Sequence, residues 1–433
     1  MKRNSIFKNT IWIVSCRLVQ SLLSLVIGML TARYLGPSDY GLVNYAASVV
    51  AFVAPFMKLG LNHILVNESM NDSEKDGEIF GTAITFNIFS SVLCIIGVTA
   101  FVYVANPNEK ITLIVCVLYS FNLFAQALEM IQYWFQAKMI SQYTSLTSLG
   151  AYLIVSAYKV YLLIAQKSIY WFAVSQTLDY IIVAVVLIIF FKKLSHQKFS
   201  ISMQRFRKMF SQSKHFIISS LMITVFAQTD KIMLKSMLSS EAVGIYSAAI
   251  TCAGMTGFVF VAIIDSIRPV VFANKKESKK TYENSLIMCY SIVIYLSLAQ
   301  SAVFTVFSKL IIKVLYGAQY EASAKALRVI VWYTTFSYMG SIRNIWLIAE
   351  EKQKYLWIIN LSGATANVLL NAMLIPWMGI MGAAWASLIT QIFTNVIVGF
   401  IMRPIRESNR LMIKGCDPRP MARYAKNLLA KIK

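Results

Sequence analysis

The sequence predicts an all-α polytopic membrane protein with about 12 transmembrane helices in two six-helix lobes. Hydrophobic residues make up 58% of the 433-residue chain and charged residues only 14%, and the mean hydropathy is +0.62. This composition excludes a soluble protein. Apolar runs of about 20 residues, the length that a helix needs to cross a bilayer, recur along the chain. Because backbone groups in lipid must be satisfied within their own segment, we expect these runs to be helical.

A sequence repeat supports the division into two lobes. The elbow that joins the first two apolar runs, TARYLGPSDYGLVNYA at 31–46, returns 203 residues later as LKSMLSSEAVGIYSAA at 234–249. This register places Gly41 on Gly244 and the apolar run 81–105 on 284–308. With eight more residues added near 316–323, the run 169–191 falls on 380–402. Matched membrane repeats commonly hold a substrate path at their interface. The functional hypothesis is therefore a transporter.

Hydropathy divides the chain into twelve spans joined by polar loops. The spans are expected at about 10–32, 41–65, 81–105, 111–135, 144–165, 169–191, 214–238, 244–268, 284–308, 323–348, 354–375 and 379–402. The predicted organisation is an N-terminal lobe at 1–195, a cytoplasmic linker at 196–213, a C-terminal lobe at 214–402 and a basic cytoplasmic tail at 403–433.

Two polar segments are candidates for the membrane surface. The stretch 192–214, KKLSHQKFSISMQRFRKMFSQSK, mixes basic and apolar residues. It favours a short amphipathic helix on the anionic inner leaflet, and a solvated linker is the alternative. The end of the tail, MARYAKNLLAKIK, has apolar residues at helical spacing, and we expect it to anchor at the interface.

The distribution of basic residues predicts the orientation. Most of the 41 Lys and Arg residues lie in the termini and the even-numbered loops, which the positive-inside rule places in the cytoplasm. Both termini are therefore expected inside. The acidic loop at 67–78 is an exception among the inner loops. The same rule explains the net charge of +22 without nucleic acid as a partner.

Neither an enzyme nor a metal protein is indicated. The six cysteines show no CxxC spacing, the three histidines are scattered, and GxSxG, HExxH, P-loop and dinucleotide-binding patterns are absent from the sequence. No residue is assigned as catalytic or metal-binding, and no cofactor is expected beyond a coupling ion, H⁺ or Na⁺.

Ionisable side chains inside the spans are the candidate site residues. A charge at the centre of a membrane helix costs about 2.5–3.5 kcal/mol on insertion scales, so it tends to face a partner or a watery cavity. Arg17, Lys159 and Asp179 lie deepest. The cations assigned to substrate binding are Arg17, Lys58, Lys159, Lys231, Arg268 and Arg343. The carboxylates assigned to ion coupling are Glu129, Asp179, Asp230 and Asp265.

These side chains suit a phosphate-bearing substrate and a coupling ion. Arg17 and Arg343 can hold a phosphate by paired hydrogen bonds, and Lys159 can act as a point charge. Asp179 and Asp230 either take up H⁺ or Na⁺ or neutralise the lysines near them, and the sequence leaves both roles open. The less deeply placed cations, Arg343 among them, can also extend to a surface.

Four stretches carry a family resemblance over essentially the whole chain. The stretches ARYLGPSDYGLVNYA, TDKIMLKSMLSSEAVGIYSAA, DSIRPVVFAN and LYGAQYEASAKALRVI together resemble the polysaccharide transporter family of flippases. That family belongs to the multidrug/oligosaccharidyl-lipid/polysaccharide exporter (MOP) superfamily. The resemblance implies two six-helix bundles in a V around a cationic cavity, as in MATE transporters. It also implies that the chain moves undecaprenyl-pyrophosphate-linked oligosaccharide, such as an O-antigen repeat unit of lipopolysaccharide, across the bacterial inner membrane by alternating access.

The resemblance also extends to single positions and to partners. Asp230 and Lys231 match an Asp and a following basic residue in span 7 of the family, whereas Lys235 stands where a glycine is common. The implied partners are the lipid-linked glycan, membrane lipids and the polysaccharide polymerase machinery. The alternatives are a cation-coupled multidrug exporter of the same fold, a membrane glycan polymerase or ligase, and a scaffold for glycan assembly.

Overall fold

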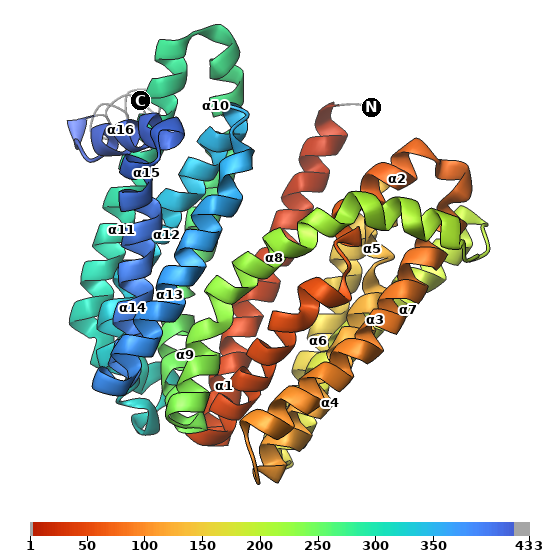
Figure 1. The fold of residues 1–433 in the computed structure, drawn as a ribbon, viewed down its shortest axis with the longest axis horizontal. Coiled ribbons are helices and arrows are strands. Elements are labelled where there is room, and N and C mark those ends of the chain that lie inside the picture. Colours follow the sequence, from red (N-terminus) through yellow and green to blue (C-terminus); the bar gives the residue numbers. More distant parts are fainter. Residues whose placement is uncertain (1–2, 420–433) are drawn as a thin grey trace. The chain divides into compact units, whose positions relative to one another are not determined.

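The computed structural model describes the backbone of residues 3–419 and the side chains of Cys16 and of residues 18–419. Every regular element in this part is helical, as predicted (Figure 1). The α-helices are α1 (Arg3–Met57), α2 (Leu65–Asn71), α3 (Asp76–Ala105), α4 (Lys110–Glu129), α5 (Gln132–Ala137), α6 (Gln142–Ile164), α7 (Ile169–Ser195), α8 (Met203–Met237), α9 (Ser240–Gly254), α10 (Gly257–Glu277), α11 (Lys279–Tyr316), α12 (Ser323–Ala349), α13 (Leu356–Met378), α14 (Ile380–Ile392), α15 (Val398–Ile401) and α16 (Arg406–Gly415).

The first two predicted spans lie in one kinked helix rather than in two helices joined by a loop. Helix α1 continues through the elbow, and only Gly36 departs from helical geometry, with φ 73° and ψ 171°. Glycine adopts this conformation without a Cβ clash, and Pro37 disfavours a helical residue before it. The elbow is therefore a kink. The helix ends at Met57, since Leu59 and Gly60 both have positive φ.

Other predicted spans are interrupted. The fourth breaks at 130–131 between α4 and α5, and the eighth breaks at 255–256 between α9 and α10. The last contains a five-residue π-helix, Phe393–Ile397, between α14 and α15. Single π turns inside α-helices are frequent at functional sites, so this interruption bears on the site described below.

Ten helices in the described part are long and apolar enough to cross a membrane. Helix α1 counts once although it contains two predicted spans, and α12 is not among the ten. Helix α12 carries Lys325, Arg328 and Arg343, and most of its residues are buried by neighbouring helices. Because it packs mainly against protein, it tolerates polar residues that a lipid-facing helix excludes.

The contacts divide the chain into two compact units, residues 1–244 and 245–433. In the first, α1 packs against α8, α4 and α6, and α4 packs against α3 and α7 (Figure 1). An apolar cluster lies around the ends of α3, α5 and α7, where Phe80, Phe135 and Phe191 are fully buried. This cluster fixes the helix ends near the acidic loop.

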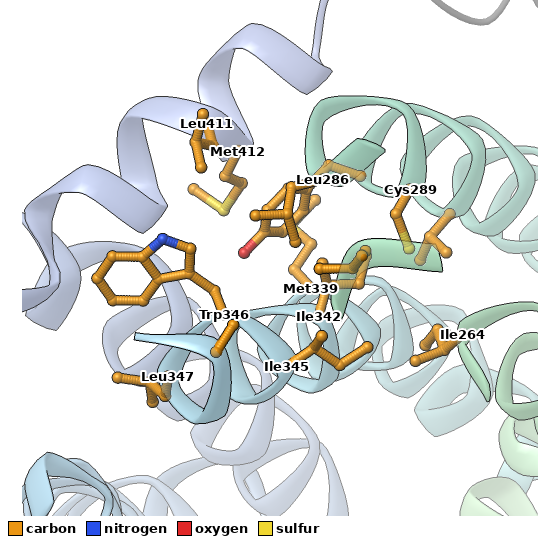
Figure 2. Packing of buried hydrophobic residues seen from close by; sticks show 14 of the residues in the cluster. Ile264, Leu286, Cys289, Met339, Ile342, Ile345, Trp346, Leu347, Leu411 and Met412 are labelled. Carbon is orange, nitrogen blue, oxygen red and sulfur yellow. The ribbon is translucent and has the colours of Figure 1, made fainter. Parts of the chain in front are cut away.

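The second unit is organised around α12. This helix packs against α11 and α14, and α16 lies against α11. Figure 2 shows the core where these elements meet, with Trp346 of α12 beside Leu411 and Met412 of α16. Trp346 is only 1% exposed. Burying such side chains contributes about 25 cal/mol per Å² of apolar area, so α16 belongs to the folded core.

The linker between α7 and α8 follows α3 closely. Residues 197–202 are not helical, and residues 203–213 form the first three turns of α8. The Ser200 backbone N–H donates to the Gly77 carbonyl, at 3.3 Å. Any side chain at Gly77 would collide with linker backbone, because its Cβ would lie 2.3 Å from the Lys198 carbonyl oxygen. A residue without a side chain at position 77 therefore lets the linker lie on α3.

The elbow and its repeat contact each other through their glycines. A Cβ on Gly41 would lie 1.8 Å from the Ser240 carbonyl oxygen, and one on Gly244 would lie 1.9 Å from the Pro37 carbonyl oxygen. The register that aligns Gly41 with Gly244 also aligns Pro37 with Ser240. Gly41 thus contacts Ser240 and Gly244 contacts Pro37, and these two contacts are equivalent in the two copies. Such a reciprocal pair of contacts is what a two-fold axis produces.

Candidate functional site

Four of the predicted site residues form a row of charges inside the first unit, with two neighbouring carboxylates between two lysines. Lys58 follows the end of α1, Glu129 ends α4, Lys159 lies in α6 and Asp179 in α7. Glu129 interacts electrostatically with Lys58 and with Asp179, and Asp179 interacts with Lys159. None of the ion pairs within 4 Å in the described part joins two of these four. The charges are neighbours that remain available to other ligands.

Buried polar atoms without hydrogen-bond partners accompany these charges. They include one carboxylate oxygen of Asp179, the hydroxyl of Thr177 two residues before it, and the hydroxyl of Ser156 three residues before Lys159. Tyr152 lies beside Ser156 and Asp179. A buried polar atom without a partner costs about 1–3 kcal/mol, so this interior is suited to water or a small ion.

The guanidinium of Arg343 is buried in the second unit. Arg343 is 5% exposed, so it does not extend to a surface. It donates to the Thr394 carbonyl oxygen at 2.7 Å and to Oδ1 of Asn395 at 2.8 Å. Its Nε makes no hydrogen bond. No carboxylate pairs with Arg343 among the described ion pairs, so the hydrogen bonds described for its guanidinium go to neutral acceptors.

The π-helix explains why those acceptors are available. Thr394 and Asn395 belong to the π turn, whose longer hydrogen-bond spacing frees a backbone carbonyl. Gly340, one turn before Arg343, lets Asn395 approach, because a Cβ at 340 would lie 2.4 Å from its Oδ1. The side chain of Asn395 also bonds to that of Gln391. Arg343 and the π turn therefore fix each other.

The other predicted cations and carboxylates lie in different settings. Asp230 and Lys231 are neighbours on α8, with Asp230 7% exposed. Asp265 and Arg268 form a 2.9 Å pair one turn apart on α10, and both are about half exposed. The backbone of Arg17 lies in α1, but its side chain is outside the described residues, as is the part of the tail from 420 onward. The structure therefore does not bring all the predicted residues into one described cluster.

Sequence reasoning missed a strong ion pair at Lys235. Its ammonium, with a side chain only 6% exposed, lies 2.6 and 2.9 Å from the two carboxylate oxygens of Glu109. Thr112 donates to the same carboxylate at 2.5 Å. Hydrogen bonding from Lys235 holds the pKa of Glu109 below its usual value. The lysine that departs from the family pattern is thus neutralised, and the signal available was an acidic residue directly before span 4.

The acidic loop is neutralised by the linker. Arg205 in the first turn of α8 lies 2.8 Å from Asp72, 3.1 Å from Glu78 and 3.7 Å from Glu68. Hydrogen bonding from Arg205 lowers the pKa of Asp72. Lys208 lies 3.5 Å from Glu68. The loop that departs from the positive-inside rule therefore faces basic residues of its own chain.

Comparison with known proteins gives the fold and the family. A family model described as polysaccharide biosynthesis protein matches residues 6–275. The chain belongs to this polysaccharide biosynthesis family. No curated protein matches the sequence at a significant level. Solved structures of MOP-superfamily transporters, in contrast, match along nearly its whole length.

Three solved structures illustrate the shared fold. The lipid II flippase MurJ in an inward closed conformation has a TM-score of 0.67 at 14% identity, covering 94% of this chain and 90% of its own. An inward-facing multidrug resistance MATE transporter has a TM-score of 0.66 at 13% identity, covering 91% and 96%. A MOP transporter from Pyrococcus furiosus has a TM-score of 0.61 at 12% identity, covering 94% and 96%.

These matches confirm several predictions for this member of the polysaccharide biosynthesis family. It is an all-α, multi-pass membrane protein with the MOP transporter fold. Its family is one of polysaccharide biosynthesis proteins and its fold is the one found in solved transporters and a flippase, which agrees with the expectation that it is not an enzyme. This finding argues against the alternative of a glycan polymerase or ligase.

Proposed function

We propose that the protein is a flippase that moves undecaprenyl-pyrophosphate-linked oligosaccharide from the cytoplasmic to the outer leaflet of the bacterial inner membrane by alternating access. The observation that carries the proposal is the joint match to a polysaccharide biosynthesis family and to a transporter fold shared with a lipid II flippase. Repeat units such as those of O-antigen fit this substrate class. Both termini lie in the cytoplasm in this proposal, where polymerase machinery and membrane lipids are further partners.

The pyrophosphate is proposed to interact with interior cations. Arg343 supports this role because it is buried, bonded only to neutral acceptors and has a free Nε. A buried cation without a carboxylate favours an anionic ligand. Lys58 and Lys159 are further candidate ligands in the first unit, and Lys231 is one on α8. Arg17 completes the set as a predicted ligand from α1.

Coupling to H⁺ or Na⁺ is assigned to the carboxylates of the first unit. Asp179 and Glu129 support it because each faces a lysine without a contact pair, and Asp179 keeps an unbonded oxygen. Binding of a cation at such a site changes its net charge, and this change can favour one conformation over another. Asp230 remains a second candidate, whereas Asp265 is paired with Arg268 on an exposed face.

Transport in reconstituted vesicles tests the proposal. Vesicles that contain the protein should move a fluorescent undecaprenyl-pyrophosphate oligosaccharide between leaflets faster than protein-free vesicles, measured by the loss of a membrane-impermeant quencher's access. Asp179→Asn should remove the dependence on an ion gradient. Asp265→Asn, the matched control on α10, should retain that dependence.

A cation-coupled drug exporter is the second candidate, favoured by the equally high similarity to a MATE transporter. The same vesicles separate the two functions. Gradient-driven uptake of a cationic dye without movement of the lipid-linked glycan would replace the flippase proposal by the exporter. Loss of complementation by Arg17→Ala in a flippase-null strain, at normal protein abundance, would add support for the flippase.

A further inference from the structure

The linker and the start of α8 have an inner side that is fully used. Phe199 stacks on Phe191 at a ring distance of 4.9 Å, and Met209 is completely buried. Arg205 lies among three carboxylates of the acidic loop. Phe206 stacks on Phe86 at 3.7 Å. The side chains that point inward therefore already have partners within the first unit.

The outer side of α8 carries a different kind of surface. Positions 203, 207, 211, 214 and 218 share one helical face, since they are spaced by three or four residues. All five are exposed, with Met203 at 54% and Ile218 at 63%. Ile201, just before the helix, is 63% exposed. We call this face the outer stripe; its members are Met203, Arg207, Ser211, Lys214 and Ile218.

The cations of the outer stripe have no acidic partners. Neither Arg207 nor Lys214 takes part in an ion pair in the described part of the chain. Arg205 and Lys208, on the adjoining face, are bound by the acidic loop. Cations in one short segment are thus divided between an inner set that is neutralised and an outer set that is not.

The length of α8 places the stripe at the membrane boundary. Its 35 residues span about 52 Å at 1.5 Å per residue, whereas the hydrocarbon core is about 30 Å thick. About 20 residues suffice to cross, so about 15 remain, and Figure 1 shows the first turns of α8 running at an angle to the rest of the helix, across the ends of α3 and α7. If they lie at the N-terminal end, Lys214 falls near the start of the apolar part, with Arg207 two turns before it.

We propose that the outer stripe is a docking surface for anionic phospholipid headgroups of the membrane in which the protein is embedded. Arg207 and Lys214 contact lipid phosphates, and Ile201, Met203 and Ile218 enter the boundary between headgroups and acyl chains. Exposed apolar side chains that alternate with unpaired cations are the composition of interfacial helices. This surface is independent of which substrate the protein transports.

Spin labels measure the location of the stripe. A nitroxide is placed at Met203→Cys or Ser211→Cys in a Cys416→Ser background, which removes the exposed native thiol. The protein is reconstituted in vesicles of phosphatidylethanolamine with phosphatidylglycerol. We expect both labels to be more accessible to oxygen than to a water-soluble nickel complex. Greater access to nickel would place the stripe in water, and low access to both would place protein over it; either result overturns the proposal.

Charge variants test the contact with phosphate. Near an anionic membrane each Lys or Arg contributes about a fivefold factor to binding. Arg207→Gln/Lys214→Gln should therefore lower about 25-fold the ratio of labels located in the headgroup layer to labels located in water. Replacing phosphatidylglycerol by phosphatidylcholine should act in the same direction. The matched control is Lys309→Gln/Lys313→Gln, which removes two exposed lysines near the C-terminal end of α11. An unchanged ratio, or an equal change in the control, would refute phosphate binding by the stripe.

Discussion

Breaking the Lys235–Glu109 pair from its two sides should have unequal effects. Removing one partner of a buried ion pair costs about 3–5 kcal/mol, whereas exposed pairs contribute about 0–1 kcal/mol. The Lys235 side chain is 6% exposed and that of Glu109 is 47% exposed. Glu109→Gln leaves a buried ammonium without its carboxylate and is expected to cost about 2 kcal/mol. Lys235→Met leaves a carboxylate that water can solvate and should cost less than about 1 kcal/mol.

Unfolding by SDS in mixed micelles measures this difference. The free energy of unfolding should fall in the order wild type, Lys235→Met, Glu109→Gln. The double variant should resemble Lys235→Met, because no buried charge is left without a partner. A larger loss for Lys235→Met than for Glu109→Gln would show that the methylene packing of the lysine matters more than its charge, and would refute the electrostatic reasoning.

Three further predictions concern pH, the elbow and the π turn. The folded protein holds the pKa of Glu109 below its usual 4.5. The ion pair therefore stabilises the fold above pH 4.5, and this contribution is lost as the pH falls through the folded pKa. Because Lys235→Met lacks the pair, its unfolding midpoint should fall less below pH 4.5 than that of the wild type. Gly41→Ala should cost about 3 kcal/mol by overpacking, while Gly28→Ala, whose Cβ meets nothing within 4 Å, should be nearly neutral, as unfolding titrations would show. Arg343→Lys should lose about 1.5–3 kcal/mol, because an ammonium does not reproduce both guanidinium bonds, and an unchanged unfolding midpoint would contradict this.

Hydropathy alone located the helices because insertion into lipid is decided by each segment's own residues. It did not locate their interruptions. The kink at Gly36 replaces a loop, since one glycine followed by proline changes the chain direction without ending the helix. Helix α12 was predicted as a span, but it is not among the ten helices that are long and apolar enough to cross a membrane, because most of its residues are buried by neighbouring helices and it carries charged residues.

The partners of the charged residues depended on distant parts of the chain. Lys235 meets Glu109 across 126 residues, and Arg343 meets Thr394 across 51. The spacing of residues within one helix does not predict contacts between residues that lie so far apart in the sequence. The polar residues around 391–395 were visible in the sequence as an unusual group inside an apolar span, but the π turn that makes them acceptors is a property of the backbone.

The reciprocal contact between Gly41 and Gly244 resembles the interface of a homodimer folded into one polypeptide. In a dimer of identical chains, any mutation at such a contact appears on both sides of the axis at once. After the two copies are joined in a single gene, each glycine can mutate alone, yet each still faces the backbone of the other copy. Each elbow therefore has to keep its glycine at the point where the main chains touch, even where the rest of the two copies differs.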